Sequence, residues 1–219
     1  MVKVGEGMIV IVDYGMGNLR SVEKGFLRVG YSAMVSSSAK DIENAKGIVL
    51  PGVGAFGDCI RNLEKLGLIE VIKEGIYGGK WFLGICLGYQ VLFEESEEFV
   101  RTRGMGIFKG RVKRFEAEMR DEEGGFLKVP HIGWNQVEVV KAHPIFEGIE
   151  SGDYFYFVHS YYVEPMDKEL ILTTTDYGVR FASGIASKNV IAFQFHPEKS
   201  QSKGLVLLKN FAKLVYDKG

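Results

Sequence analysis

Residues 80–90 read KWFLGICLGYQ, and this stretch decides the fold that the sequence predicts. Its first half is apolar at successive positions, which is typical of a strand buried on both faces in a parallel sheet. The second half has a helical pattern, and between the two lies Cys86, flanked by Gly84 and Gly88. The stretch therefore predicts a strand that turns sharply into a helix, with a cysteine on the turn.

The residues before this stretch alternate between short apolar runs and amphipathic segments. Such a rhythm favours β-α-β units and a parallel sheet covered by helices on both faces. We expect strands within residues 8–15, 32–37, 46–52 and 80–85, and helices within residues 18–30, 56–76 and 87–95. The first half of the chain is therefore expected to be doubly wound.

The residues after about position 106 change to an alternation of apolar and polar side chains that is typical of antiparallel strands. This alternation occurs in residues 106–116, 135–140, 154–164 and 169–177, before an apolar strand at 189–196 and a closing amphipathic helix. No linker rich in Pro, Gly or Ser separates the halves. We predict an α/β fold with a flavodoxin-like, doubly wound mixed sheet and an antiparallel extension, in a single domain of residues 1–219.

Charge and cysteine content exclude several classes of function. The 27 basic and 28 acidic residues nearly balance, so no basic field attracts nucleic acid or an anionic membrane. The apolar run at residues 8–12 ends at Asp13, too soon for a signal peptide or membrane span. Cys59 and Cys86 lack metal-ligand spacing, and two free thiols indicate a cytoplasmic protein without a metal. Residues 15–20 lack the third glycine of a dinucleotide fingerprint, so no cofactor is expected.

The environment of Cys86 has the logic of a nucleophile elbow. Gly84 and Gly88 leave room for a tight turn, and the following helix begins next to the sulfur. The helix dipole favours a thiolate, and the amide of Leu87 points where an oxyanion would form. A cysteine at a plain strand end remains the alternative, and Cys59, inside a helical pattern, is expected to be simply buried.

A nucleophilic cysteine needs a base and a group that orients the base. His196 ends an apolar strand, and Pro197 favours an extended backbone there. Extended geometry places Glu198 on the same face, where its carboxylate fixes the imidazole tautomer. The other histidines, His131, His143 and His159, are expected to be structural or to lie in a turn.

The loop at residues 50–58, LPGVGAFGD, follows another expected strand and is rich in glycine. Such a loop can turn its backbone amides inward to bind an oxyanion. A plain strand-to-helix turn also favours glycine, so the loop alone does not decide between the two functions.

Three motifs, PGVGAFGD, GICLGYQ and FQFHPEKS, together resemble those of the class I, triad-type glutamine amidotransferases over nearly the whole chain. Residues 13–21, 131–137 and 155–162 further resemble the glutaminase subunits of imidazole glycerol phosphate synthase, the histidine-pathway enzyme. The resemblance implies that Cys86 attacks the side-chain amide of L-glutamine, with His196 as base and Glu198 as its orienter.

The resemblance also assigns binding roles. It implies an oxyanion hole formed by amides of Gly52, Val53 and Leu87. The residues implied to hold the glutamine head group are Gln90, Glu98, Ser160 and Tyr161. Glu98 lies in a run of charges, where a solvated side chain is the alternative reading.

A partner chain is expected because no segment remains for a site that uses ammonia. The resemblance implies a (βα)8-barrel cyclase subunit that makes imidazole glycerol phosphate and AICAR, with an ammonia tunnel between the chains. The implied interface includes Trp134, Asn135 and Tyr156. Because uncoupled hydrolysis would waste glutamine, we expect the amide of Val53 to be turned away in the unpartnered protein.

Two other functions stay open at this level. One is a binding or regulatory subunit without catalysis, against which the intact set of Cys86, His196 and Glu198 argues. The other is a different enzyme of the superfamily, such as a γ-glutamyl hydrolase or the glutaminase of anthranilate, aminodeoxychorismate or pyridoxal phosphate synthesis. The stretch DYGMGNLRS at residues 13–21 favours the histidine-pathway branch.

Overall fold

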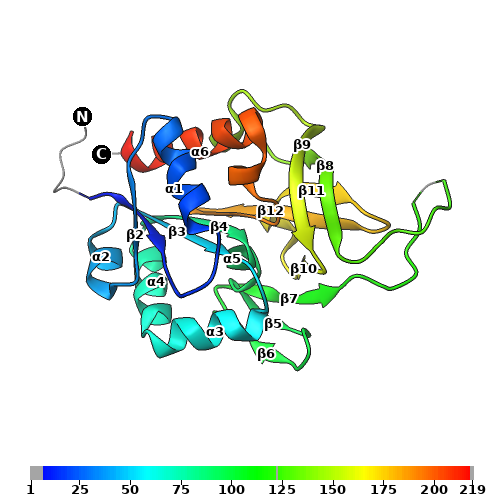
Figure 1. The fold of residues 1–219 in the computed structure, drawn as a ribbon, viewed down its shortest axis with the longest axis horizontal. Helices are drawn as coiled ribbons and strands as arrows, with labels where there is room; N and C mark the ends of the chain where they lie inside the picture. Colours follow the sequence, from blue (N-terminus) through cyan, green and yellow to red (C-terminus); the bar gives the residue numbers. More distant parts are fainter. Residues whose placement is uncertain (1–6, 122, 218–219) are drawn as a thin grey trace.

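A mixed sheet with helices on both faces forms the centre of the molecule (Figure 1), and the computed structural model describes residues 7–121 and 123–217. The strands of the described residues are β1 (Ile9–Val12), β2 (Ala33–Ser36), β3 (Gly47–Gly52), β4 (Trp81–Cys86), β5 (Phe93–Ser96), β6 (Thr102–Arg103), β7 (Phe108–Arg114), β8 (His131–Val139), β9 (Asp153–His159), β10 (Tyr161–Pro165), β11 (Ile171–Asp176), β12 (Arg180–Ser187) and β13 (Val190–Phe193). The α-helices are α1 (Leu19–Arg28), α2 (Ala39–Asn44), α3 (Phe56–Lys65), α4 (Leu68–Tyr77), α5 (Leu87–Gln90) and α6 (Gln201–Tyr216). Short 3-10 helices are η1 (Pro144–Phe146), η2 (Lys168–Leu170) and η3 (Pro197–Lys199).

The parallel part of the sheet has the strand order β2-β1-β3-β4-β13. This is the 2-1-3-4-5 order of flavodoxin-like sheets, in which ligands bind beyond the carboxyl ends of the strands. The predicted doubly wound fold is confirmed. The carboxyl ends of β3, β4 and β13 lie next to one another, and they carry Gly52, Cys86 and the approach to His196.

Strand β1 shows why apolar runs without alternation predict a covered sheet. Ile9 and Ile11 pack with residues of α1 and α6 in one cluster, whereas Val10 and Val12 pack with residues of α2, α3 and α4 in another. Successive side chains of a strand point to opposite faces, so both faces are apolar because both are covered by helices. Figure 1 shows α1 and α6 on one side of the sheet and α3 and α4 on the other.

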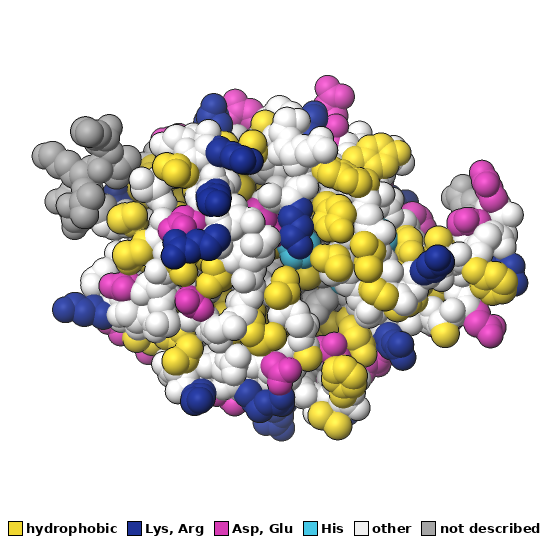
Figure 2. All heavy atoms as spheres, in the orientation of Figure 1, with side chains coloured by type: hydrophobic (Ala, Val, Ile, Leu, Met, Phe, Trp, Pro, Cys, Tyr) yellow, Lys and Arg dark blue, Asp and Glu magenta, His cyan; other side chains and the backbone are white. Residues whose placement is uncertain are grey.

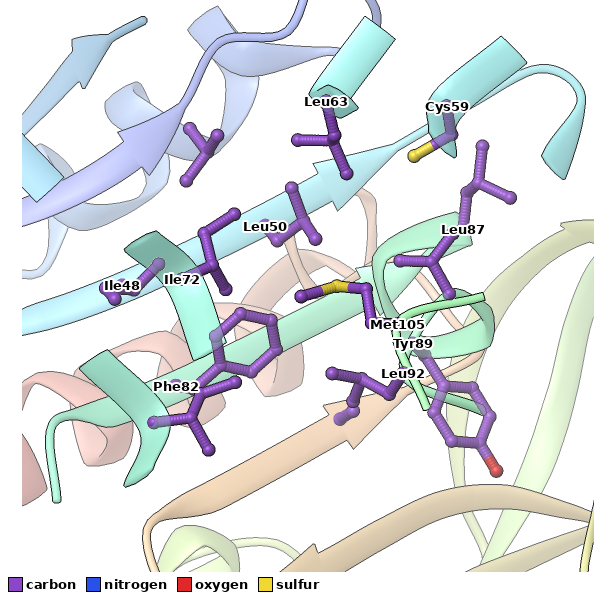
Figure 3. Packing of buried hydrophobic residues seen from close by; sticks show 14 of the residues in the cluster. Ile48, Leu50, Cys59, Leu63, Ile72, Phe82, Leu87, Tyr89, Leu92 and Met105 are labelled. Atoms are coloured by element: carbon purple, nitrogen blue, oxygen red, sulfur yellow. The ribbon is translucent and has the colours of Figure 1, made fainter. Parts of the chain in front are cut away.

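The cluster on the α3–α4 side includes Cys59 (Figure 3). Its side chain is fully buried beside apolar neighbours such as Leu63 and Leu87. Burial raises the pKa of the Cys59 thiol to about 12, so this sulfur stays protonated and unreactive near neutral pH. The expected structural role of Cys59 is therefore supported by its surroundings.

The second half of the chain extends the sheet with mainly antiparallel pairs. Strand β12 continues from β13, β10 and β7 follow, and β11 pairs with both β12 and β8. Strands β8 and β9 form a long antiparallel pair at the end of this extension. Strand β12 and helix α2 were absent from the elements that the sequence pattern predicted.

Two predicted helices differ from the structure. The segment at residues 56–76 is two helices, because Gly67 has a φ of 67° and ends the first one. The helix expected at residues 87–95 is one turn, since α5 ends at Gln90 and Phe93 begins strand β5. Val91, Leu92 and Phe93 are all fully buried. Three consecutive buried side chains leave no exposed helix face, and the chain enters strand β5 at Phe93. None of the helices in the described residues is long and apolar enough to cross a membrane.

Candidate functional site

Strand β4 ends in a tight turn at Cys86, which lines a cavity. Cys86 has φ 55° and ψ −106°, a region that residues with a side chain rarely occupy and that stores strain at functional sites. A Cβ atom on Gly88 would overlap the carbonyl oxygen of Leu50, and one on Gly84 would lie 2.7 Å from the carbonyl oxygen of Gly88. The two glycines are therefore required because the turn packs directly against neighbouring backbone.

The register of β13 brings a polar side chain, Gln194, to the same edge, directly after the strand ends. Strand β13 runs parallel to β4, with Phe193 opposite Ile85, so Gln194 follows at the level of Cys86. The amide of Gln194 donates a hydrogen bond to the Cys86 sulfur over 3.6 Å. Gln194 is not among the site residues that the sequence predicted. Its position could have indicated a role, because it is a polar residue in an apolar run, two positions before His196.

The loop after β13 fixes His196. Its backbone amide donates to the carbonyl of Tyr156 over 2.9 Å, and its own carbonyl accepts from the hydroxyl of Ser200 over 2.6 Å. The imidazole Nδ1 lies 2.8 Å from Oε1 of Glu198, and both side chains are at most 2% exposed. The expected contact between His196 and Glu198 is present. A 3-10 turn at residues 197–199 produces it, and not the extended backbone that the sequence predicted.

Electrostatics favour a charged imidazole at this position. Burial opposes a charge on His196, but the Cys86 thiolate and the Glu198 carboxylate favour it more strongly, and the pKa of His196 rises to about 10. Nε2 of His196 has no hydrogen-bond partner in the part of the chain that the structure describes. The ring therefore has one nitrogen committed to Glu198 and the other available to exchange a proton with Cys86.

A cavity of about 370 Å³ opens over Cys86. It is lined by predicted site residues, namely Val53, Cys86, Leu87, Gln90, Glu98, Ser160 and Tyr161, and also by Gly54, Pro130, Val158, His159 and Lys199, which the sequence interpretation did not include. His196 and Glu198 are buried and do not line it. Among residues 7–121 and 123–217, no group of three or more His, Cys, Asp or Glu side chains could hold a metal ion.

Glu98 and Gln90 are held by specific contacts. Oε2 of Glu98 accepts a hydrogen bond of 2.6 Å from the amide of Phe56, the first residue of α3, so this carboxylate is not merely a solvated charge. Partial burial raises the pKa of Glu98. Gln90 is 6% exposed, and its amide nitrogen donates to the carbonyl of Tyr161 and to Oε1 of Gln194, each over 3.0 Å.

Gly52 and Val53 lie at the carboxyl end of β3, beside the elbow. Gly52 pairs with Cys86 across the strands, and a Cβ atom there would lie 2.5 Å from the hydroxyl of Tyr14 and 2.7 Å from the side chain of Leu87. Val53 is 37% exposed, and Gly54 has a φ of 94° that favours glycine. The carboxyl end of β3 therefore reaches the cavity next to Leu87.

Two buried histidines form a hydrogen-bonded chain at the cavity, which His159 lines. The amide nitrogen of Asn135 contacts Nε2 of His131 at 3.3 Å, Nδ1 of His131 contacts Nε2 of His159 at 3.0 Å, and Nδ1 of His159 donates to the carbonyl of Tyr161 over 2.8 Å. Burial lowers the pKa of His131 to about 4 and of His159 to about 3. Both rings are neutral near pH 7, and the expectation of structural histidines fits this arrangement.

An apolar face of the β8–β9 pair lies beside the site. Trp134 is 44% exposed and packs edge-to-face on Tyr156 with ring centroids 6.0 Å apart. Ile132 and Tyr154 are more than half exposed on the same strand pair. Figure 2 shows hydrophobic side chains gathered over this part of the molecule. The side chain of Asn135 instead donates to the carbonyl of Asp176 over 2.8 Å, next to His131.

The fold and the site define a class. Residues 10–214 match the family model described as glutamine amidotransferase class-I, and the chain belongs to that family. Its fold agrees, since a crystal structure described as a glutamine amidotransferase has a TM-score of 0.71 at 19% identity, covering 94% of this chain and 98% of that one. The structure of PurLQS from Thermotoga maritima has a TM-score of 0.70 at 18% identity and covers 97% and 99%.

Sequence relatives point to one branch of the class. The chain is 54% identical to the imidazole glycerol phosphate synthase subunit HisH of Syntrophotalea carbinolica, covering 94% of this chain and 100% of the relative. It is 53% identical to HisH of Aquifex aeolicus, covering 93% and 95%. HisH of Bacillus subtilis is 45% identical over 94% of this chain and 96% of the relative.

Proposed function

We propose that this chain is the glutaminase subunit of an imidazole glycerol phosphate synthase. It hydrolyses L-glutamine to glutamate and passes the ammonia to a partner cyclase subunit in histidine biosynthesis. The observation that carries the reaction is the strained turn that holds Cys86 at a cavity, with the His196–Glu198 pair buried next to it.

The reaction proceeds in two halves. The Cys86 sulfur, whose proton has passed to Nε2 of His196, attacks the carbon of the glutamine side-chain amide as a thiolate. The imidazolium then protonates the leaving nitrogen, the C–N bond breaks, and ammonia departs from a glutamyl thioester. Water, deprotonated by the same imidazole, cleaves the thioester and restores the thiol. Glu198 stabilises the imidazolium through its 2.8 Å contact with Nδ1.

Backbone amides of Leu87 and of the Gly52–Val53 turn stabilise the negative oxygen of the tetrahedral intermediate. Their place at the ends of β4 and β3 supports this role, because both ends border the cavity. Loss of one such donor typically raises the barrier by roughly 3 to 4 kcal/mol. In this proposal the Val53 amide is turned away until the partner binds.

The polar lining of the cavity suits the head group of glutamine. The carboxylate of Glu98 is fixed by the start of α3 and fits the α-ammonium group of the substrate. Gln90, Ser160 and Tyr161 complete the proposed binding set, and each of them lines the cavity.

The partner in this proposal is a (βα)8-barrel cyclase that seats on the apolar face of the β8–β9 pair. Trp134 and Tyr156 are the proposed contacts on this face, whereas the implied contact Asn135 directs its side chain to the other face, toward Asp176 and His131. Exposed aromatic side chains close to the cavity favour this placement, since such residues are enriched in interface cores. The same proposal places the complex in the cytoplasm, where the two unpaired cysteines stay reduced.

Ammonia release from glutamine tests the proposal, measured first on the chain alone and then with the barrel subunit and its nucleotide substrate. We expect the barrel subunit and its substrate to stimulate ammonia release strongly. Cys86→Ala should lower the stimulated rate by at least about a thousandfold, because it removes the attacking sulfur. Cys59→Ala, which removes a buried cysteine that does not line the cavity, is the matched control and should keep the stimulation. High activity of the chain alone would favour a hydrolase, and no release in either case would favour a binding subunit.

A further inference from the structure

We propose that Gln194 is a catalytic residue whose side-chain amide donates a hydrogen bond to the Cys86 sulfur and stabilises the thiolate. The inference rests on the proposed function, in which that sulfur is the nucleophile. It goes beyond the triad and the oxyanion amides, because it adds a donor aimed at the reacting sulfur itself.

The position of Gln194 is set by the sheet. Gln194 continues β13, and its backbone amide donates to the carbonyl of Ser183 over 2.8 Å. In the parallel register Ala192 faces Gly84, so the residues two positions further along, Gln194 and Cys86, share a face. A fully buried amide in an apolar strand costs free energy unless it is hydrogen-bonded, so its retained polarity requires a partner.

The orientation of the amide follows from its neighbours. The carbonyl oxygen of Tyr161 can only accept, so the end of Gln90 that meets it is the nitrogen. That same nitrogen lies 3.0 Å from the Gln194 side chain and donates to it, so the atom of Gln194 facing Gln90 is Oε1. The NH₂ group of Gln194 must therefore face the Cys86 sulfur, 3.6 Å away.

The network is anchored on its far side. His159 donates from Nδ1 to the same Tyr161 carbonyl over 2.8 Å, and His131 supports His159 in turn. Every donor in the path from His159 to Cys86 has an acceptor. Such a satisfied buried network holds the Gln194 amide in one orientation before the substrate arrives.

The Cys86 sulfur has two contacts that favour opposite protonation states. Its proton can be donated to the carbonyl of Val158 over 3.9 Å, which favours the neutral thiol. When the proton moves to Nε2 of His196, the sulfur becomes an anion and the bond from Gln194 becomes charge-assisted and stronger. Among the described residues, His196 and Tyr14 interact electrostatically with Cys86. The titratable side chains that line the cavity beside Cys86 are those of Glu98, His159, Tyr161 and Lys199.

Alkylation of Cys86 by iodoacetamide across the pH range tests this role in the full chain, with the Cys86 peptide quantified by mass spectrometry. In Gln194→Met the donor is lost, and we expect the midpoint of the rate–pH curve to rise by about one unit. The rate on the rising limb then falls about tenfold, while the plateau at high pH is unchanged. Gln194→Glu keeps the acceptor for Gln90 but replaces the donor, and should raise the midpoint at least as far.

Asn210→Leu is the matched control, because Asn210 is a buried amide on α6 that donates to the carbonyls of Ile145 and Glu147. It should lower the melting temperature without moving the alkylation midpoint. An unchanged or lowered midpoint in whichever Gln194 variant folds would overturn the inference. Alkylation needs no glutamine turnover, so a shifted midpoint without stimulated ammonia release would sink the proposed function alone.

Discussion

The buried pair His131 and His159 makes the protein sensitive to acid. Their pKa values are about 4 and about 3 in the folded chain, against about 6.5 in the unfolded one. The unfolded state therefore binds more protons below pH 6.5, so stability is full above that pH and lost as pH falls toward 4. Protonation of each histidine should lower the free energy of unfolding by about 2 kcal/mol between pH 6.5 and pH 5.

Urea unfolding at pH 7 and at pH 5 measures this loss. His131→Gln removes one titrating group, so its unfolding free energy should change less between the two values than that of the wild type. An equal change in both proteins would contradict the assignment. His196 has the opposite sign, because its pKa is raised to about 10, and its contribution is lost as pH rises from 6.5 toward 10.

At the scale of elements, the β8–β9 pair presents an apolar face that a partner would cover. Trp134 is 44% exposed on this face and packs edge-to-face on Tyr156. Trp134→Ala removes this exposed aromatic side chain. If this face is the interface, binding of the barrel subunit should weaken by about 2 kcal/mol or more, measured by calorimetry. Tyr77→Ala, an exposed aromatic at the end of α4, is the control and should bind as the wild type does. Equal affinity of the two variants would move the interface elsewhere.

At the scale of the whole molecule, we predict that the chain unfolds as one domain. The sheet passes from the parallel part into the extension without a break, and α6 packs on α1 and β4 as well as on η1 and β9. Trp81 lies in β4 and Trp134 in β8, so each tryptophan reports on one half. Trp81→Phe and Trp134→Phe should each show a fluorescence midpoint that coincides with the loss of far-ultraviolet circular dichroism. Two separate midpoints within one variant would indicate two domains.

Local patterns were sufficient for much of the fold. The apolar runs at β1, β3 and β4 predict a covered parallel sheet because both faces of each strand must be buried. The glycines around Cys86 predict the tight turn because any side chain there would meet backbone. By contrast, α5 is one turn long since tertiary burial of Val91, Leu92 and Phe93 outweighs the helical pattern of residues 87–95.

The amino-acid sequence by itself determined where the proposed catalytic groups lie in the chain: the Cys86 elbow, the His196–Glu198 pair and the glycine-rich end of β3 are each encoded within a few neighbouring residues. Only the tertiary structure decided which atoms meet. Three sets of contacts join residues far apart in the chain: the Gln90–Gln194–Cys86 hydrogen bonds, the contact of Glu98 with the start of α3, and the His131–His159 pair. Strand register and burial set those distances, and neither is visible in a local pattern.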